Sequence, residues 1–94
     1  MNMLGENILV KEAPAKDFKQ DGIVVSRDDD DTYMFVEILS INENTFNNLL
    51  SFGFVEGDYL VIKRVAKIPF IGDTYIISLK DVLGIMPLDE YNNL

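Results

Sequence analysis

Apolar residues gather in short runs that are separated by turn-forming residues. Runs rich in β-branched, aliphatic and aromatic residues predict strands at 7–11, 32–41, 74–79, in the part of 55–65 after a Glu56-Gly57-Asp58 turn, and in 80–86 after a short turn. The run 32–41 is almost continuously apolar, which predicts a strand covered on both faces. Short strands at close spacing, with turn signals between them, predict an all-β fold built as a small barrel.

Two segments are less regular. In 42–54, Asn44 could cap a short helix that places Phe46, Leu49 and Leu50 on one face at helical spacing, or the segment could form an irregular turn. The end of the chain, "PLDEYNNL", reads as a polar tail with Pro87 as its stop.

Segment 15–32 is mostly polar, and only Phe18 and the triplet Ile23–Val25 interrupt it. Long connections without secondary structure in a compact domain are usually functional or disordered. The triplet is short for a core strand and lacks the alternation of a half-buried one. Composition alone leaves a core strand and an exposed element that binds a partner in extended form about equally favoured.

The chain has 94 residues, which predicts a single domain over 1–94. Its net charge of −8 disfavours binding to nucleic acid or to anionic membranes, because both need clustered basic side chains. The absence of cysteine and histidine excludes disulfides, thiolate nucleophiles, imidazole catalysis and zinc sites with nitrogen or sulfur ligands. No signal peptide and no apolar run of about 20 residues is visible, so we expect a cytoplasmic protein.

Acidic residues are the remaining candidates for chemistry. The run Asp28–Asp31 could bind Ca²⁺, but it lacks the spacing and the glycine of an EF-hand loop, and a solvated charge run is the preferred interpretation. The acid pairs Glu56/Asp58 and Asp89/Glu90 have ordinary roles in a turn and a tail. No glycine-rich phosphate loop is present. The sequence therefore predicts no enzyme activity, no metal and no cofactor.

The order of these features resembles the GroES-type co-chaperonin family over about residues 5–86. The first strand ends in "VK", "VEGDYLV" partly matches the family's V-x-x-G-D-x-V turn, and "DVLGIM" is similar to its last strand. The family's mobile loop carries a glycine and an aliphatic triplet, which are matched here by Gly22, Ile23, Val24 and Val25.

The resemblance implies an irregular GroES-like β-barrel with a long mobile loop at about 16–31. It further implies a heptameric ring that caps an ATP-bound GroEL-type chaperonin and encloses a substrate protein for folding. The loop residues Gly22–Val25 would bind the chaperonin, which binds the ATP, so the chain itself needs no cofactor. The last strand of one subunit would pair with the first strand of its neighbour. The predicted interface residues are Ile8, Val10, Leu83 and Ile85.

The sequence also departs from the family. The segment equivalent to the polar roof hairpin, about 42–54, is shorter and rich in Phe and Leu. Such divergence would suit a virus-encoded co-chaperonin that acts in the host cytoplasm. One alternative is a non-chaperone interaction or viral assembly barrel in which Ile23–Val25 is a core or edge strand. Another, a fragment of a zinc alcohol dehydrogenase with the same fold, is disfavoured by the lack of cysteine and histidine.

Overall fold

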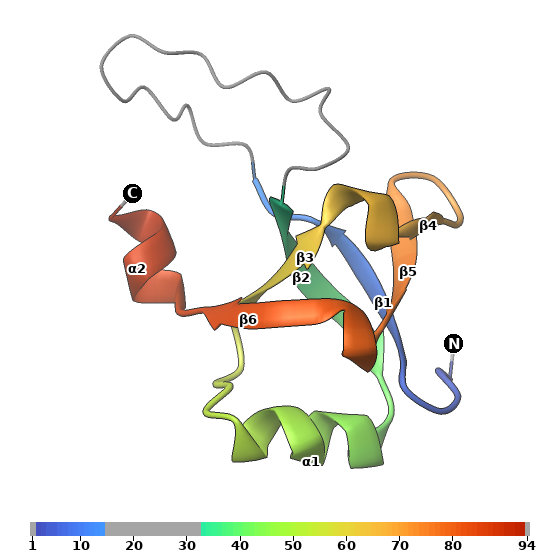
Figure 1. The fold of residues 1–94 in the computed structure, drawn as a ribbon, viewed down its shortest axis with the longest axis horizontal. Helices are drawn as coiled ribbons and strands as arrows, with labels where there is room; N and C mark the ends of the chain where they lie inside the picture. The colour runs from blue at the N-terminus through green and yellow to red at the C-terminus, as the bar shows by residue number, and fades with distance from the viewer. Residues whose placement is uncertain (1, 15–32, 94) are drawn as a thin grey trace, which may run out of the picture.

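The computed structural model describes residues 2–14 and 33–93. Within them, six strands form one antiparallel sheet in the order β4-β5-β1-β2-β3-β6 (Figure 1). The strands are β1 Asn7–Glu12, β2 Tyr33–Ile41, β3 Tyr59–Lys63, β4 Ile68–Pro69, β5 Thr74–Ser78 and β6 Val82–Met86, and the helices are α1 Glu43–Ser51 and α2 Leu88–Asn92. Two 3₁₀ turns, η1 Arg64–Ala66 and η2 Leu79–Asp81, precede β4 and β6.

The predicted β class is confirmed, but the sheet is not a closed barrel. The strand order ends at β4 on one side and at β6 on the other, and these two strands are not paired within the described residues. Register shifts at Leu9/Val10 and at Val61/Ile62 mark irregular pairing, which bends a sheet. One physical reason for the open sheet is that β4 has two residues and includes Pro69, which has no N–H to donate to a further strand.

The core follows the alternation of side chains along the inner strands. The fully buried side chains are Ile8, Val10, Val36, Leu49, Leu60, Ile62 and Ile77. Burying an aliphatic side chain of this size stabilises a fold by about 1.5–3 kcal/mol. In β2, Met34 and Val36 are buried while Tyr33 and Leu39 are exposed, so the expectation that both faces are fully covered was wrong.

Segment 42–54 contains a helix, as one of its two interpretations predicted. The N-cap is Asn42 rather than Asn44, and its side-chain oxygen accepts a hydrogen bond from the Thr45 N–H at 2.8 Å. The Thr45 hydroxyl donates to the Gly5 carbonyl at 2.9 Å and ties the start of α1 to the N-terminal segment. Leu49 is buried and Leu50 is 45% exposed, so the two leucines do not share the inner face.

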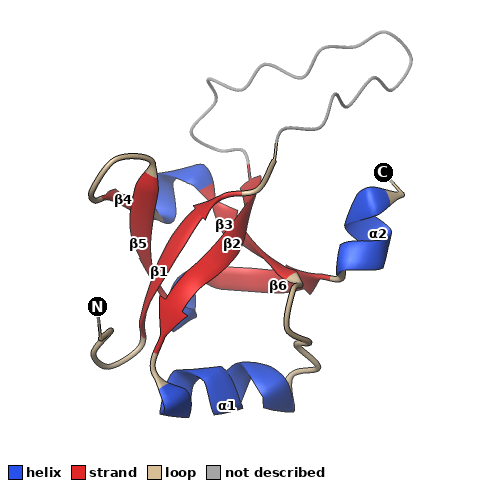
Figure 2. Cartoon of the chain, turned by 180° about the vertical axis from the view of Figure 1, so that it is seen from behind, coloured by secondary structure: helices blue, strands red, loops and turns tan. Residues whose placement is uncertain are grey.

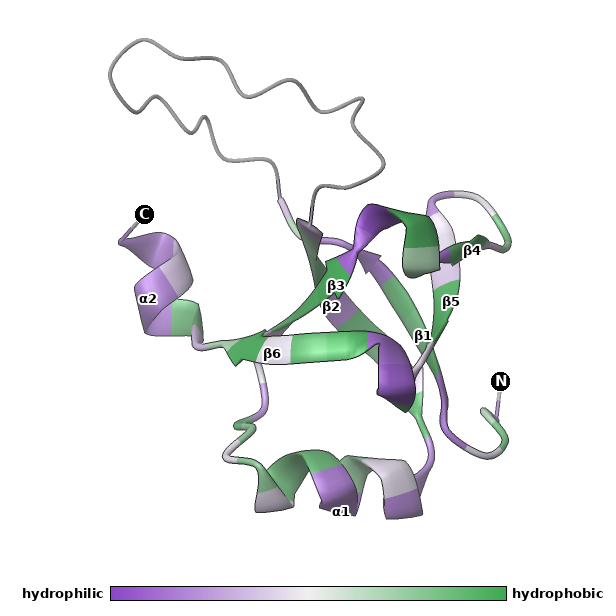
Figure 3. Cartoon of the chain, viewed as in Figure 1, coloured by the Kyte–Doolittle hydropathy of each residue, from purple (hydrophilic) through white to green (hydrophobic). Residues whose placement is uncertain are grey.

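The end of the chain is a packed helix rather than a polar tail. Figure 3 shows why the sequence suggested a tail, because α2 is mostly hydrophilic. Tyr91 is nevertheless only 4% exposed. Its ring meets Phe35 and Tyr59 edge-on, with centroids 5.4 and 4.5 Å apart, and its hydroxyl donates to the Pro14 carbonyl. One aromatic side chain therefore fastens α2 to the sheet. Neither helix of the described ranges is long and apolar enough to span a bilayer.

Candidate functional site

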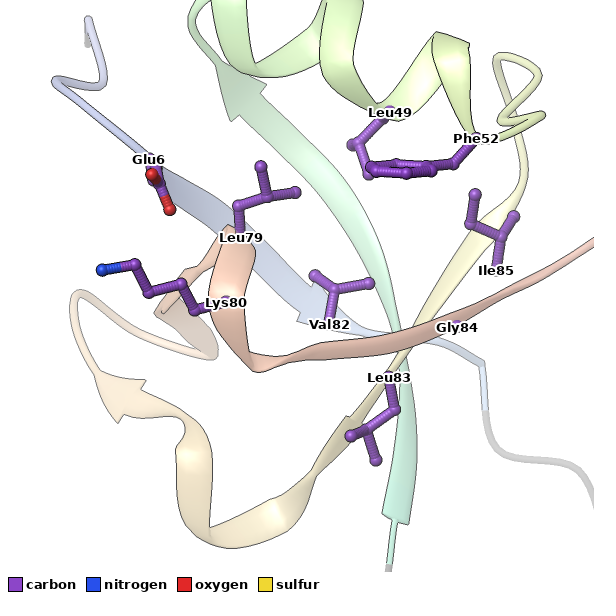
Figure 4. A pocket seen from close by; sticks show the side chains of 9 residues that line it. All are labelled: Glu6, Leu49, Phe52, Leu79, Lys80, Val82, Leu83, Gly84 and Ile85. Atoms are coloured by element: carbon purple, nitrogen blue, oxygen red, sulfur yellow. The ribbon is translucent and has the colours of Figure 1, made fainter.

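An open groove of about 680 Å³ lies between α1 and β6 (Figure 4). It is lined by Glu6, Leu49, Phe52, Leu79, Lys80, Val82, Leu83, Gly84 and Ile85. Figure 4 shows Leu49 and Phe52 reaching in from α1 toward Val82 and Ile85 of β6. Glu6 and Lys80 lie together at one end. Most of the lining is therefore apolar, with one charged end.

Local geometry explains how α1 ends beside the groove. Phe52 is the C-cap of α1, and the next residue, Gly53, has a φ of 95°. That left-handed conformation is accessible to glycine at little cost, and it turns the chain away from the helix axis. Phe52 is consequently 73% exposed at the rim of the groove.

β6 contributes an unpaired edge beside this groove. Within the described residues it pairs only with β3, with Val61 opposite Gly84 and Ile62 opposite Val82. The register shift leaves Leu83 with no opposite residue, and its side chain points away from α1 (Figure 4). A free strand edge offers N–H and C=O groups to an added strand. The arrangement suits the binding of an apolar, extended segment.

The charged residues of the groove lie at its exposed end. In the two described ranges, no group of three or more Asp or Glu side chains is placed to hold a metal ion. Glu6 and Lys80 are the charged residues of the groove, and both are exposed. Exposed, solvated charges beside an apolar surface are typical of the rim of a binding surface.

A second hollow, of about 360 Å³, is lined by residues that follow α1 and by residues that follow β6 along the chain. The lining residues are Gly53, Val55, Glu56, Asp58, Pro87, Leu88 and Asp89. Asp58 holds its two sides together, because its carboxylate accepts hydrogen bonds from the Val55 N–H at 3.0 Å and the Leu88 N–H at 3.2 Å. The pair Glu56/Asp58 thus includes a structural acid, in line with the interpretation of the turn.

Only the two β6 residues of the predicted subunit interface reach the surface. Leu83 is 60% exposed and Ile85 is partly buried, and both line the groove. Ile8 and Val10, in contrast, are fully buried in the core. β1 also pairs with β2 on one side and with β5 on the other, so neither of its edges is free for a neighbouring subunit. The prediction that β1 pairs across subunits is corrected for this reason.

The predicted chaperonin-binding residues Gly22, Ile23, Val24 and Val25 lie outside the described residues, as does the whole predicted loop 16–31. The structure does place the two ends of the connection that carries them. β1 and β2 pair as far as Glu12 opposite Val36, and the Ala13 N–H donates to the Phe35 carbonyl at 2.9 Å. The connection therefore leaves and re-enters between two adjacent inner strands.

The segment expected to be equivalent to a roof hairpin forms α1 and the turn after it. Sequence reasoning noted its Phe and Leu residues but did not recognise a groove. The available signal was the pair of aromatic residues around a glycine in "SFGF", which fits a helix end with an exposed side chain.

Comparison of the chain with protein-family models, with curated proteins and with solved structures finds no match.

Proposed function

We propose that the chain is a subunit of a co-chaperonin ring that caps an ATP-bound chaperonin of GroEL type and encloses a substrate protein. One observation carries the proposal. The sequence Gly22-Ile23-Val24-Val25 belongs to the connection between β1 and β2, two paired strands at the middle of a small β domain. A binding element on such a connection has a rigid base, because both of its ends are fixed by the ladder.

The proposed mechanism is capping. The aliphatic triplet docks in extended form on an apolar groove of the chaperonin and displaces substrate from it. The chaperonin supplies the ATPase activity, and this chain acts without a cofactor. The negative net charge of the chain leaves nucleic acid an unfavourable partner.

Binding by one triplet should be weak. Burial of Ile23, Val24 and Val25 contributes roughly 1.5–3 kcal/mol each. Fixing the backbone of about eight residues costs on the order of 1–2 kcal/mol apiece. The ordering cost therefore matches or exceeds the gain from burial, so tight capping requires several triplets on one ring, where the first contact raises the effective concentration of the others. A heptameric ring is the proposed assembly.

The test compares chaperonin binding by the whole protein and by its variants, with ATP present. A peptide of residues 16–31 should bind with a dissociation constant of roughly 0.1 mM or weaker, and the assembled protein at least about a hundredfold more tightly. Val24→Asp should abolish binding and leave the circular dichroism spectrum unchanged. Ser26→Asp adds the same charge two positions away and should retain most of the binding. Full binding by Val24→Asp, or no binding by the unaltered protein, would refute the proposal.

The groove between α1 and β6 favours a second candidate function. It is apolar, it lies beside an unpaired strand edge, and its geometry does not involve segment 15–32. A non-chaperone interaction or viral assembly protein would use such a surface without any chaperonin. Assembly of the protein together with a failure to bind any chaperonin would support this candidate over the first.

A further inference from the structure

The segment from η1 through β4 to the turn before β5 carries exposed apolar residues at one end of the sheet. We call it the hairpin surface, and it consists of Val65, Ile68, Phe70 and Ile71, which are 67, 62, 39 and 71% exposed. The turn is held by hydrogen bonds from the Phe70 N–H to the Thr74 carbonyl at 3.0 Å and from the Thr74 N–H to the Ile71 carbonyl at 3.1 Å. Phe70 and Ile71 are therefore held in place by an ordered turn, while Val65 lies in η1 and Ile68 in β4, just before it. Exposed apolar residues that gather in one region mark interaction sites.

Positive charge borders the hairpin surface. Lys63, Arg64 and Lys67 fall within five consecutive positions of a chain whose net charge is −8. The Lys67 ammonium group donates to the Arg64 carbonyl at 3.2 Å and lies 5.3 Å from the centroid of the Tyr75 ring. These contacts fix the Lys67 side chain beside the turn. The hairpin surface is thus an apolar patch whose rim is mainly basic. Arg64 is paired with Glu12 at 3.8 Å, and the exposed Asp73 of the turn adds one acidic group, so Lys63 and Lys67 supply the remaining positive charge.

A surface of opposite character lies at the other end of the sheet. We call it the acidic end, and it consists of Phe52, Val55 and Leu88 together with Glu56, Asp58 and Asp89. Phe52 and Val55 are 73 and 64% exposed. Figures 1 and 2 show β4 and α2 at opposite sides of the sheet from both directions of view. The described part of each copy therefore has two different apolar surfaces, one with a mainly basic rim and one with an acidic rim.

We infer that the hairpin surface of one copy docks against the acidic end of the next. Apolar side chains meet apolar side chains in this contact, and Lys63 and Lys67 approach Glu56 and Asp89. Opposite charges around an apolar centre steer association and disfavour contacts between two copies of the same surface, in which like charges would meet. The contact does not pair β4 with β6 of the next copy, because β4 has two residues and Pro69 removes one of its donors.

Because the two surfaces differ and lie at opposite ends, the contact is head to tail. Such a contact repeats from copy to copy and yields a closed ring or an open filament rather than a two-fold dimer. The inference deepens the proposed function, since it names the surfaces that would join a ring. It depends on described residues alone and makes no use of segment 15–32.

The absence of native cysteine makes a direct test possible. Ile71→Cys and Val55→Cys are prepared separately, mixed, oxidised and separated on a non-reducing gel. We expect a disulfide-linked dimer in the mixture, at least about tenfold more abundant than in either variant alone, as head-to-tail contact requires. The control Leu39→Cys, at a 43% exposed position of β2, should give little product with Ile71→Cys. Equal linkage by the control, or self-linkage of Ile71→Cys as strong as in the mixture, would overturn the inference.

A charge reversal gives an independent readout. Lys67→Glu should weaken self-association by about tenfold in sedimentation velocity, because it brings like charges together. Adding Glu56→Lys to that variant should restore association, which simple misfolding of the first variant would not allow. Failure of the second substitution to restore association would count against the contact.

The cross-linking test of this contact and the chaperonin-binding test of the proposed function can succeed or fail independently. Head-to-tail cross-links in a protein that binds no chaperonin would leave the inference standing and remove the co-chaperonin proposal. Chaperonin binding by a ring that forms no Ile71–Val55 cross-link would do the reverse.

Discussion

Tyr91 offers a quantitative test of whether the C-terminal helix belongs to the folded domain. Its side chain is 4% exposed, packs edge-on against Phe35 and Tyr59, and donates a hydrogen bond to the Pro14 carbonyl. Truncating a buried aromatic side chain to alanine costs about 3–5 kcal/mol. Because α2 is short and terminal, it can move after truncation, so we expect Tyr91→Ala to cost about 3 kcal/mol. Tyr91→Phe removes only the hydroxyl and should cost about 0.5–1.5 kcal/mol.

Urea unfolding at a fixed protein concentration measures both losses, and the fixed concentration removes the effect of assembly on apparent stability. With a denaturant slope of roughly 1 kcal/mol/M for a domain of this size, Tyr91→Ala should lower the midpoint by about 3 M and Tyr91→Phe by about 1 M. Asn92→Ala changes an exposed residue of the same helix and should stay within about 0.5 kcal/mol. A loss below about 1 kcal/mol for Tyr91→Ala would refute the reasoning, because it would mean that α2 is detached in solution.

Three further predictions concern the sheet and α1. Asn42→Ala should lower the free energy of unfolding by about 1–2 kcal/mol in the same urea assay, because it removes the N-cap of α1; a change near zero would contradict this role. Leu49→Ala should cost about 2–5 kcal/mol in thermal or urea unfolding, and the half-exposed Leu50→Ala less than about 1 kcal/mol; equal losses would mean that the helix is rotated. The Lys11 Nζ and Glu37 Oε2 atoms lie 3.5 Å apart, and the two side chains are 44 and 43% exposed. A double-mutant cycle should therefore give a coupling free energy below about 1 kcal/mol. A coupling of about 2 kcal/mol or more would contradict a solvent-screened pair.

The strands were predictable because their signal is local. A run such as 74–79 indicates a strand through its β-branched residues and its flanking turn residues, and the structure has β5 there. The order of strands in the sheet carries no such local signal. The interface prediction treated the first strand as an edge, whereas β1 lies between β2 and β5, and this is the reason that Ile8 and Val10 belong to the core.

The C-terminal helix was missed for a related reason. "PLDEYNNL" contains one aromatic residue among polar ones, so it shows no apolar periodicity. Tyr91 is buried because Phe35, Tyr59 and the Pro14 carbonyl are brought together from distant parts of the chain. The groove next to α1 was missed in the same way, since its two walls come from segments that are adjacent only in space.

The ladder between β1 and β2 has a consequence for how this protein can change over generations. The pairing of Glu12 with Val36 and the hydrogen bond from the Ala13 N–H to the Phe35 carbonyl hold the two strands together where the connection between them begins and ends. The free energy of closing a chain segment grows with the logarithm of its length, so doubling the segment costs only about 0.6 kcal/mol. Insertions that lengthen the connection between β1 and β2 therefore add little closure free energy against the sheet. Selection for a stable sheet and selection on the length of this connection can therefore act on separate parts of the chain.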